Sequence, residues 1–220
     1  MFCYSYIYKY LLKKKMSRYR GPRLRLTRRL GKLPGLTMKK PMNLRPPGQH
    51  GIARSKKKRS LSEYAIRLNE KQKLRFNYGV SEKQLFNYLK ASRRLSGATG
   101  TNLLQFLEMR LETTVYNLGF APTIPAARQL VNHGHIAVNN KRVNIPSFLC
   151  KPNDIITVKN QPQSKVLVKN SLELNPRNRI PNHLQLDAKN LIGKVNSIIL
   201  RKEINLNVNE LLIVEFYSRK

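Results

Sequence analysis

The sequence predicts an α+β protein with a basic N-terminal arm and a helical domain, into which a compact module of two helices and a small sheet is inserted. Three observations support this prediction. Lys and Arg number 43 among 220 residues, against 11 Asp and Glu, and most of the cations come early. In the middle of the chain apolar residues recur every three or four positions, which is typical of helices. Beyond Gly134 the spacing falls to two, which is typical of strands.

The charge predicts a polyanionic partner. The formal net charge is +32, and such a chain repels itself strongly unless a polyanion neutralises it. Residues 1–105 carry 27 cations and 3 acids, whereas residues 106–220 carry 16 and 8. Hydrophobic residues still make up 40% of the chain, which indicates a folded core rather than a disordered basic tail. Nucleic acid is therefore the expected partner, and the N-terminal half is expected to contribute more of the attraction.

The first fifteen residues, Met1–Lys15, differ from the rest. Aromatic residues come first and lysines follow, without a small-residue cleavage site, which is the reverse of a secretory signal. A second methionine, Met16, opens a very basic stretch. We expect Met16 to be the working start and residues 1–15 to be a leader or a disordered extension. The intact mass of the natural protein would test this.

Residues 17–60 contain Pro, Gly and cations without a sustained apolar period, so we expect an arm without a packed core. Within it, "LRPPGQHGIARSKKKRS" (44–60) surrounds His50 with prolines and glycines and ends in four consecutive cations, 56–59. This pattern fits a phosphate-binding loop, a metal site, a nuclear-import signal or a basic arm laid along nucleic acid. The glycine spacing does not match a nucleotide-binding P-loop.

Helices are predicted over residues 61–95, where apolar residues alternate with cations. Gly79 offers a helix stop, and Ser81 with Gln84 fits a capping box, in which each residue bonds the other's backbone N–H.

The clearest helix is predicted from Asn102 to Gly119, and a second from Thr123, which can cap it, to Gly134. The short connection requires the two helices to pack against each other. Arg110 and Arg128 are then expected on a shared outer face.

Strands are predicted after Gly134. Ile136 and Val138 are followed by "NNKR", which can turn the chain into a hairpin, and residues 155–158 add another strand. Residues 159–179 are polar and basic and are expected to form a linker or surface loop. The final "LLIVEFYS" (211–218) is rich in β-formers and predicts a strand.

The sequence contains few of the groups that catalysis or metal binding requires. The acids are scattered, and His133 and His135 have no Cys, Asp or Glu close by to complete a ligand set. Cys3 and Cys150 are the two cysteines and form no C-x-x-C pair. No apolar run approaches the roughly 18–20 residues of a membrane span. We therefore expect no enzyme, no cofactor, no metal and no membrane association.

RNA is favoured over DNA on two grounds. The helix-helix-sheet module offers no evident helix for reading the major groove and no dimerisation surface. A long irregular arm suits a folded RNA, in which shape and phosphate contacts dominate recognition.

The stretch from Leu107 to Phe148 resembles the RNA-binding module of the family of ribosomal protein four of the small subunit. The matching elements are "RLE", "VYNLGFA", "ARQLVNHGHIAVN" and "VNIPS". The resemblance extends to "PGQHG" at 47–51, "EKQKLRFNYGVSEKQ" at 70–84 and "LLIVEFYS" at 211–218. It covers most of the chain from Met16 onward. The module alone also occurs in pseudouridine synthases and tyrosyl-tRNA synthetases.

The resemblance implies a structural protein of the small ribosomal subunit that binds 16S-type rRNA, helps to nucleate assembly of the subunit body and contributes to translational accuracy. It also implies ribosomal protein five of the same subunit and the region where mRNA enters as neighbours. Many bacterial relatives hold a four-cysteine zinc cluster; this chain lacks those cysteines, so no zinc is expected. The alternative is an RNA-modifying enzyme of the pseudouridine-synthase type that carries the same module.

The expected rRNA-binding residues fall into two sets. Those in the arm and first domain are Arg23, Arg25, Arg28, Arg29, Arg45, His50, Lys56, Lys57, Lys58, Arg59 and Lys73. Those carried over from the module's motif are Arg110, Thr123, Arg128, His133 and Lys141.

The expected domains are 1–15 as a leader, 16–101 as basic arm and helical domain, 102–165 as the RNA-binding module, and 166–220 as a C-terminal segment that returns to the first domain. "PGQHG" and a richness in Lys, Asn and Ile resemble plastid or cyanobacterial versions. We expect a plastid-encoded protein of the chloroplast stroma, with a bacterial cytoplasmic or mitochondrial origin as the alternative.

Overall fold

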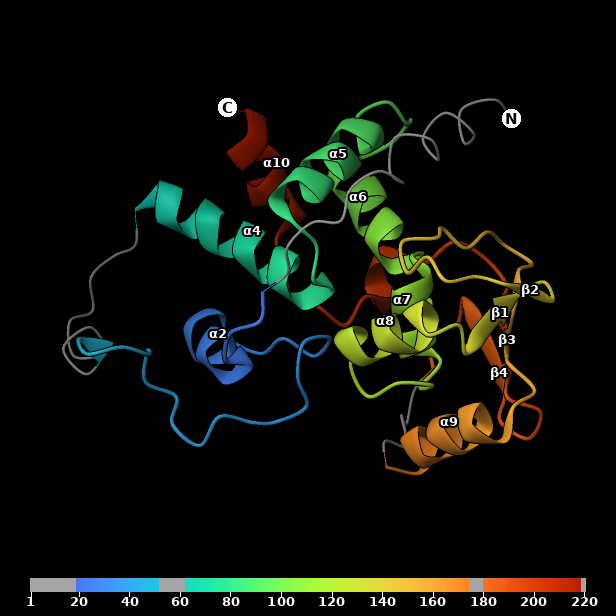
Figure 1. Cartoon of the computed structure of the whole chain (residues 1–220). Coiled ribbons are helices and arrows are strands. Elements are labelled where there is room, and N and C mark those ends of the chain that lie inside the picture. Colours follow the sequence, from blue (N-terminus) through green and yellow to red (C-terminus); the bar gives the residue numbers. More distant parts are fainter. Residues whose placement is uncertain (1–18, 52–61, 175–179, 219–220) are drawn as a thin grey trace.

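A computed structural model describes residues 19–51, 62–174 and 180–218 (Figure 1). The expected leader, Met1–Lys15, and the cations Lys56–Arg59 lie outside the described residues. The fold is α+β, as predicted. It contains two hydrophobic cores, one built from helices and one from three helices packed with a small sheet.

The first core belongs to a helical domain. Its helices are α2 (Arg23–Leu30), α4 (Glu63–Tyr78), α5 (Glu82–Ser92), α6 (Thr99–Glu108) and α10 (Glu210–Ser218). The helix ends follow the predicted signals: Gly79 closes α4 in the left-handed conformation, and Ser81 and Gln84 form the capping box of α5. The capping box is therefore confirmed.

The expectation that residues 17–60 have no packed core is wrong for part of that stretch. Leu26 and Leu30 lie one turn apart on α2 and are buried, and Leu33 and Leu36 follow them into the same core. Because arginines stand between Leu26 and Leu30 in the sequence, the apolar side of this short helix is hard to recognise from the sequence alone.

The C-terminal stretch expected as a strand is helix α10. Its buried residues, Ile213, Phe216 and Tyr217, fall at positions i, i+3 and i+4, which place them on one side of a helix. That side packs against α4 and α6. Tyr217 also reaches α5, where its ring centroid lies 5.6 Å from that of Phe86. Packing against existing helices therefore outweighs the β-propensity of the stretch.

The second core belongs to the module. It contains helices α7 (Leu111–Asn117), α8 (Ile124–Asn132) and α9 (Pro162–Leu174) and one antiparallel sheet in the order β2-β1-β3-β5-β4. The strands are β1 (Ile136–Val138), β2 (Lys141–Arg142), β3 (Ile155–Val158), β4 (Leu184–Asp187) and β5 (Ile192–Val195).

The hairpin of β1 and β2 is confirmed. Val138 pairs with Lys141, and Asn139 and Asn140 between them both have positive φ, as a two-residue type I′ turn requires. Strand β3 is confirmed; it pairs with β1 and continues the sheet toward β5.

The expected linker at 159–179 is wrong for its described part, because residues 162–174 form helix α9. Ser164 and Val168 lie one turn apart and are fully buried, and Val168 belongs to the second core. The polar and basic residues that suggested a linker occupy the outer side of this helix.

The single helix expected from Asn102 to Gly119 is two helices. Arg110 is extended (φ −70°, ψ 140°), and it forms a β-bridge with Leu149. The break has a packing reason: Leu107 before it lies in the first core, and Leu111 after it lies in the second. The residues of α6 thus pack with the helical domain rather than with the module, to which a boundary at 102 assigned them.

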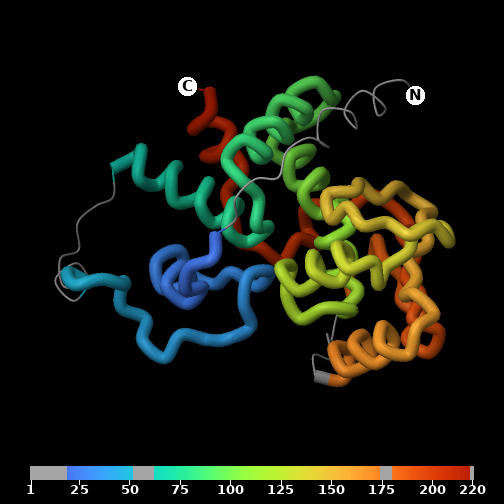
Figure 2. Tube along the Cα trace, in the orientation of Figure 1, coloured from blue at the N-terminus to red at the C-terminus, as the bar shows by residue number. Residues whose placement is uncertain are grey.

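The chain therefore leaves the helical domain after Glu108, builds the module and returns (Figure 2). The return begins later than position 166, because β4 and β5 complete the module's sheet. Ile199, Ile204, Leu206 and Val208 then rejoin the first core ahead of α10.

Candidate nucleic-acid interface

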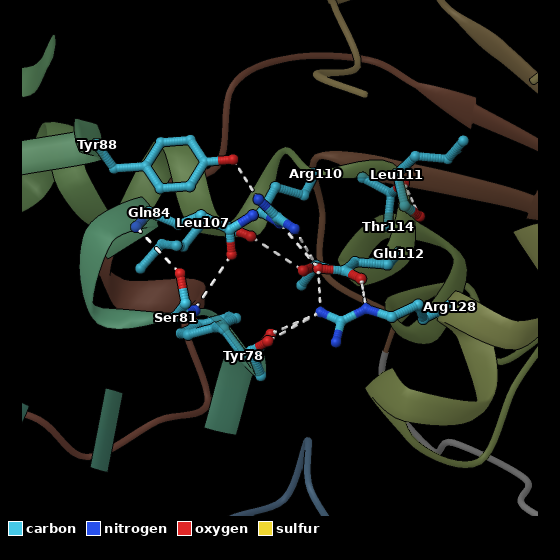
Figure 3. A network of polar contacts seen from close by, with 12 residues as sticks. Tyr78, Ser81, Gln84, Tyr88, Leu107, Arg110, Leu111, Glu112, Thr114 and Arg128 are labelled. Atoms are coloured by element: carbon cyan, nitrogen blue, oxygen red, sulfur yellow. Dashed lines mark hydrogen bonds and ion pairs between the residues drawn. The ribbon is translucent and has the colours of Figure 1, made fainter. Parts of the chain in front are cut away.

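A buried ion cluster lies where the module meets the helical domain (Figure 3). The carboxylate of Glu112, on α7, is fully buried and accepts hydrogen bonds from two arginines. Arg110 donates from Nε at 2.9 Å and from one terminal nitrogen at 2.6 Å. Arg128, on α8, donates from a terminal nitrogen at 2.8 Å and also from Nε. Two cations share one anion, so the cluster has a net positive charge.

The same two arginines reach the helical domain. Arg128 donates to the backbone carbonyls of Tyr78 at 3.3 Å and Gly79 at 3.2 Å, at the C-terminal end of α4. These carbonyls lack helical partners and favour a cation. Arg110 donates to the hydroxyl of Tyr88 on α5. The cluster therefore ties α4 and α5 to the module.

Gly79 is required at this junction. Its φ of 60° is strained for a residue with a side chain, and a Cβ there would lie 3.1 Å from the Arg128 guanidinium. The glycine thus serves both as a helix stop and as space for the arginine.

Burial alone would raise the pKa of the Glu112 carboxyl, but the two neighbouring guanidinium groups hold it below its ordinary value. Burial likewise opposes the charge on Arg110, and the Glu112 carboxylate outweighs that effect and raises the arginine's pKa. The cluster is therefore ionised at neutral pH.

The expected outer face containing Arg110 and Arg128 is wrong. Their exposed fractions are 3% and 7%, because Glu112, two residues from Arg110, draws both guanidinium groups inward. Thr114 and Asn117, which follow on α7, are buried too.

The arginines of α2 lie on the surface, as their proposed role requires. Arg23, Arg25 and Arg29 are exposed, and no acid occupies the first turn of the helix. Arg28 is half-buried and donates to the backbone carbonyl of Arg45 at 2.9 Å. Arg28 therefore fixes the loop that follows α2, and its neighbours remain available to phosphates.

The described part of the Pro-Gly loop contacts the protein itself. Gly51 donates its N–H to the Gly48 carbonyl at 3.0 Å, and a Cβ on Gly51 would lie 2.0 Å from the Pro46 carbonyl oxygen. This glycine permits a close approach within the loop. Arg45 and His50 are exposed beside it.

The remaining sequence-predicted residues are spread over both domains. Lys73, on α4, is half-buried and pairs with Glu70 at 2.5 Å. Thr123 caps α8, as predicted, by accepting the Ala126 N–H at 3.3 Å. His133, at the end of α8, and Lys141, on β2, are exposed. His133 thus lies at a helix C-terminus.

A groove of about 930 Å³ runs between the two domains. Its cationic lining comes from Arg20, Arg23, Arg75, Arg110 and Arg128, and His133 also lines it. Its other polar side chains come from Ser81, Gln84, Gln129, Asn132 and Ser147, and Tyr19 and Phe76 add aromatic rings. The lining includes no Asp or Glu among the residues that the structure describes. An anion is the ligand that such a groove favours.

Sequence reasoning missed several residues of this groove. Arg75 and Phe76 are adjacent on α4, where the helical pattern alone gave no reason to single them out. Gln129 and Asn132 lie one turn apart on the exposed side of α8. One signal in the sequence could have pointed to them. The capped start of α5 follows directly on the C-terminal end of α4, which contains Arg75 and Phe76.

Other kinds of site find no support in the described parts of the chain. There, no three His, Cys, Asp or Glu side chains gather as metal ligands, and no helix is long and apolar enough to cross a membrane.

Comparisons with known proteins agree with this division into two domains. Residues 18–108 match the model described as the Ribosomal protein S4/S9 N-terminal domain, and residues 109–156 match the S4 domain. The junction at 108/109 coincides with the break between α6 and α7.

Close relatives match over nearly their whole length. The small ribosomal subunit protein uS4 of Thermosynechococcus vestitus is 60% identical over 205 residues, which cover 93% of this chain and all of the relative. The uS4c protein of Porphyra purpurea has the same identity and coverage, and uS4 of Nostoc punctiforme is 59% identical with that coverage. This chain therefore belongs to the family of small ribosomal subunit protein uS4.

Proposed function

We propose that this chain is a structural constituent of the small ribosomal subunit and a primary binder of its 16S-type rRNA. Family membership supports the assignment. The observation that carries the binding role is the groove, to which both domains contribute arginine and no described acid. Arg23 lines the groove and also belongs to the exposed cations of α2, so the two basic surfaces adjoin.

The set of residues that we propose to contact rRNA is smaller than the set expected from the sequence. We keep the exposed Arg23, Arg25, Arg29, Arg45 and His50 of the first domain and His133 and Lys141 of the module. We also keep Lys56–Arg59, which lie outside the described residues, because four consecutive cations can bind phosphates. We leave out three residues whose side chains bond other groups of the protein: Arg28, Lys73 and Thr123. We also leave out Arg110 and Arg128, whose buried ion pairs hold the two sides of the groove together.

The finer roles rest on the resemblance of the sequence to the family. They are nucleation of subunit-body assembly, a contribution to translational accuracy, and contacts with ribosomal protein five and with the region where mRNA enters. The buried ion cluster that joins the two domains supports a role in assembly, since a preorganised protein surface can fix the relative positions of RNA segments.

The proposed compartment is the chloroplast stroma. Its support is the similarity to the plastid uS4c proteins of Porphyra purpurea and Pyropia yezoensis and to cyanobacterial uS4 proteins. A bacterial cytoplasmic or mitochondrial location is the alternative, and immunolocalisation in the source cell separates them.

A non-enzymatic role is favoured over an RNA-modifying one. A pseudouridine synthase needs a positioned Asp, and both Asp residues of this chain stabilise turns. Asp154 accepts the Lys151 N–H at 2.7 Å, and Asp187 accepts the Lys189 N–H at 3.1 Å. Incubation of the protein with rRNA should therefore yield no pseudouridine by mass spectrometry.

Co-sedimentation with small subunits tests the proposal. The full chain should remain with the subunit through a high-salt wash and be absent from the large subunit. Loss of the protein from both fractions, or equal amounts in both, would refute a structural role.

A further inference from the structure

We propose that the groove between the two domains holds an unpaired nucleotide of the bound RNA, with its base stacked on the rings at the groove's rim. This inference rests on the proposed RNA-binding function and specifies what one part of the surface recognises. It concerns an extruded or single-stranded nucleotide rather than the backbone of an RNA helix.

The size and lining of the groove favour a single nucleotide. Its volume, about 930 Å³, falls in the range of roughly 300–1,000 Å³ that is common for small-molecule pockets. A solvated helix backbone needs an open basic surface, which α2 already offers. A groove enclosed by side chains from both domains instead suits a group that projects from the RNA.

Two aromatic rings of the groove lining offer a surface for stacking a base. Tyr19 and Phe76 meet edge to face, with centroids 5.5 Å apart, and both line the groove. Tyr19 is 46% exposed, so much of its surface is uncovered. The Arg75 guanidinium lies over the Phe76 ring, 5.1 Å from its centroid, and is a further planar group of the groove lining. Aromatic rings and guanidinium planes are the groups on which proteins stack unpaired RNA bases.

The Tyr19 ring is held in place by its own backbone. A Cβ on Gly21 would lie 2.5 Å from the Tyr19 hydroxyl, so the absence of a side chain there lets the ring fold back over the chain. The edge contact with Phe76 fixes the other side. A ring that is already positioned loses little entropy when a base stacks on it.

The rest of the lining matches the other parts of a nucleotide. Arg20 and Arg23 can bind a phosphate, for which the guanidinium fork is well suited. The exposed amides of Gln129 and Asn132 can donate to and accept from a base edge or a ribose hydroxyl. The buried cluster of Arg110, Glu112 and Arg128 adds one net positive charge beneath them.

The test measures binding of the full chain to a transcript of the small-subunit rRNA, with Tyr19→Leu as the main variant. Tyr19→Leu should weaken binding about 5- to 150-fold, the range expected for loss of one base stack. Tyr19→Phe keeps the ring and should bind like the wild type. The salt dependence should be unchanged in Tyr19→Leu, whereas the matched variant Arg23→Ala should lower the slope of log Kd against log salt by about 0.7–0.9.

Photocrosslinking of the wild-type complex gives a second readout that does not depend on the variants. Adducts at Tyr19 or Phe76 should map to an unpaired nucleotide. Binding of Tyr19→Leu within twofold of wild type, a reduced salt slope in that variant, or adducts on base-paired nucleotides would each overturn the proposal. Failure of the wild type to bind rRNA would instead contradict the proposed function itself.

Discussion

Arg128 on α8 donates from Nε and Nη2 to the buried carboxylate of Glu112 on α7. The same Nη2 also donates to the carbonyls of Tyr78 and Gly79 at the C-terminal end of α4. One side chain thus connects the module's own helices to the helical domain. The geometry suits arginine, whose planar guanidinium can serve several acceptors at once, and a lysine could not replace all of these contacts.

Replacing Glu112 with Gln should destabilise the fold strongly. The substitution leaves Arg110 and Arg128 buried without a counter-ion, and breaking a buried pair in this way costs about 3–5 kcal/mol. Denaturant unfolding at neutral pH measures the free energy. Glu173→Gln, at an exposed site on α9, is the matched control and should change the unfolding free energy by less than about 0.5 kcal/mol. A loss below about 1 kcal/mol in Glu112→Gln would contradict the cluster's structural role.

The same carboxylate should make stability depend on acid pH. The pKa of Glu112 is lowered in the fold, so its contribution is fully present above the ordinary value near 4.5. It is lost as the pH falls from that value through the folded pKa. Unfolding free energy measured against pH should therefore decline less steeply on acidification in Glu112→Gln than in the wild type. Parallel curves for the two proteins would show that Glu112 does not titrate in this way.

The exposed arginines of α2 should contribute to RNA affinity chiefly through charge. The double variant Arg25→Ala/Arg29→Ala removes two side chains that are exposed. Loss of two phosphate contacts should lower the slope of log Kd against log salt by about 1.4–1.8. Lys165→Ala/Lys169→Ala on α9 removes equal charge at a distance from α2 (Figure 1) and is the control. Equal slopes for the two double variants would mean that net charge alone, rather than this helix, attracts the RNA.

Cys150 should be unreactive in the folded protein. Burial raises the pKa of its thiol to about 12, and the side chain packs in the second core beside Thr114. Iodoacetamide at pH 8 should label Cys150 only after denaturation, as peptide mass spectrometry can show. Labelling at the rate of a free thiol under native conditions would contradict the packing of the module.

Sequence reasoning succeeded where local chemistry decides the structure. Capping residues, left-handed glycines and the Asn139–Asn140 turn act on their immediate neighbours, so their signals survive without knowledge of the fold. It failed where tertiary packing decides. The stretch at α10 has β-forming residues but also the i, i+3, i+4 spacing of a helix, and only the surface offered by α4 and α6 selects between them.

The prediction of the candidate site succeeded and failed for the same reasons. Composition alone predicted a basic, anion-binding protein. It could not separate Arg25, which is exposed, from Arg128, which Glu112 and two α4 carbonyls hold inside, because that difference depends on residues distant in the sequence. The groove could not be predicted from the sequence either, because its lining comes from both domains.

The most direct test of the account is the affinity of the full chain for small-subunit rRNA, compared with large-subunit rRNA, across a range of salt. With 6–10 phosphate contacts, affinity should fall by roughly 10³–10⁵ between about 50 and 200 mM salt, by analogy with duplex DNA. The small-subunit rRNA should be bound more tightly throughout. A flat salt response, or equal affinity for the two RNAs, would contradict the claim that this basic surface recognises the small-subunit rRNA.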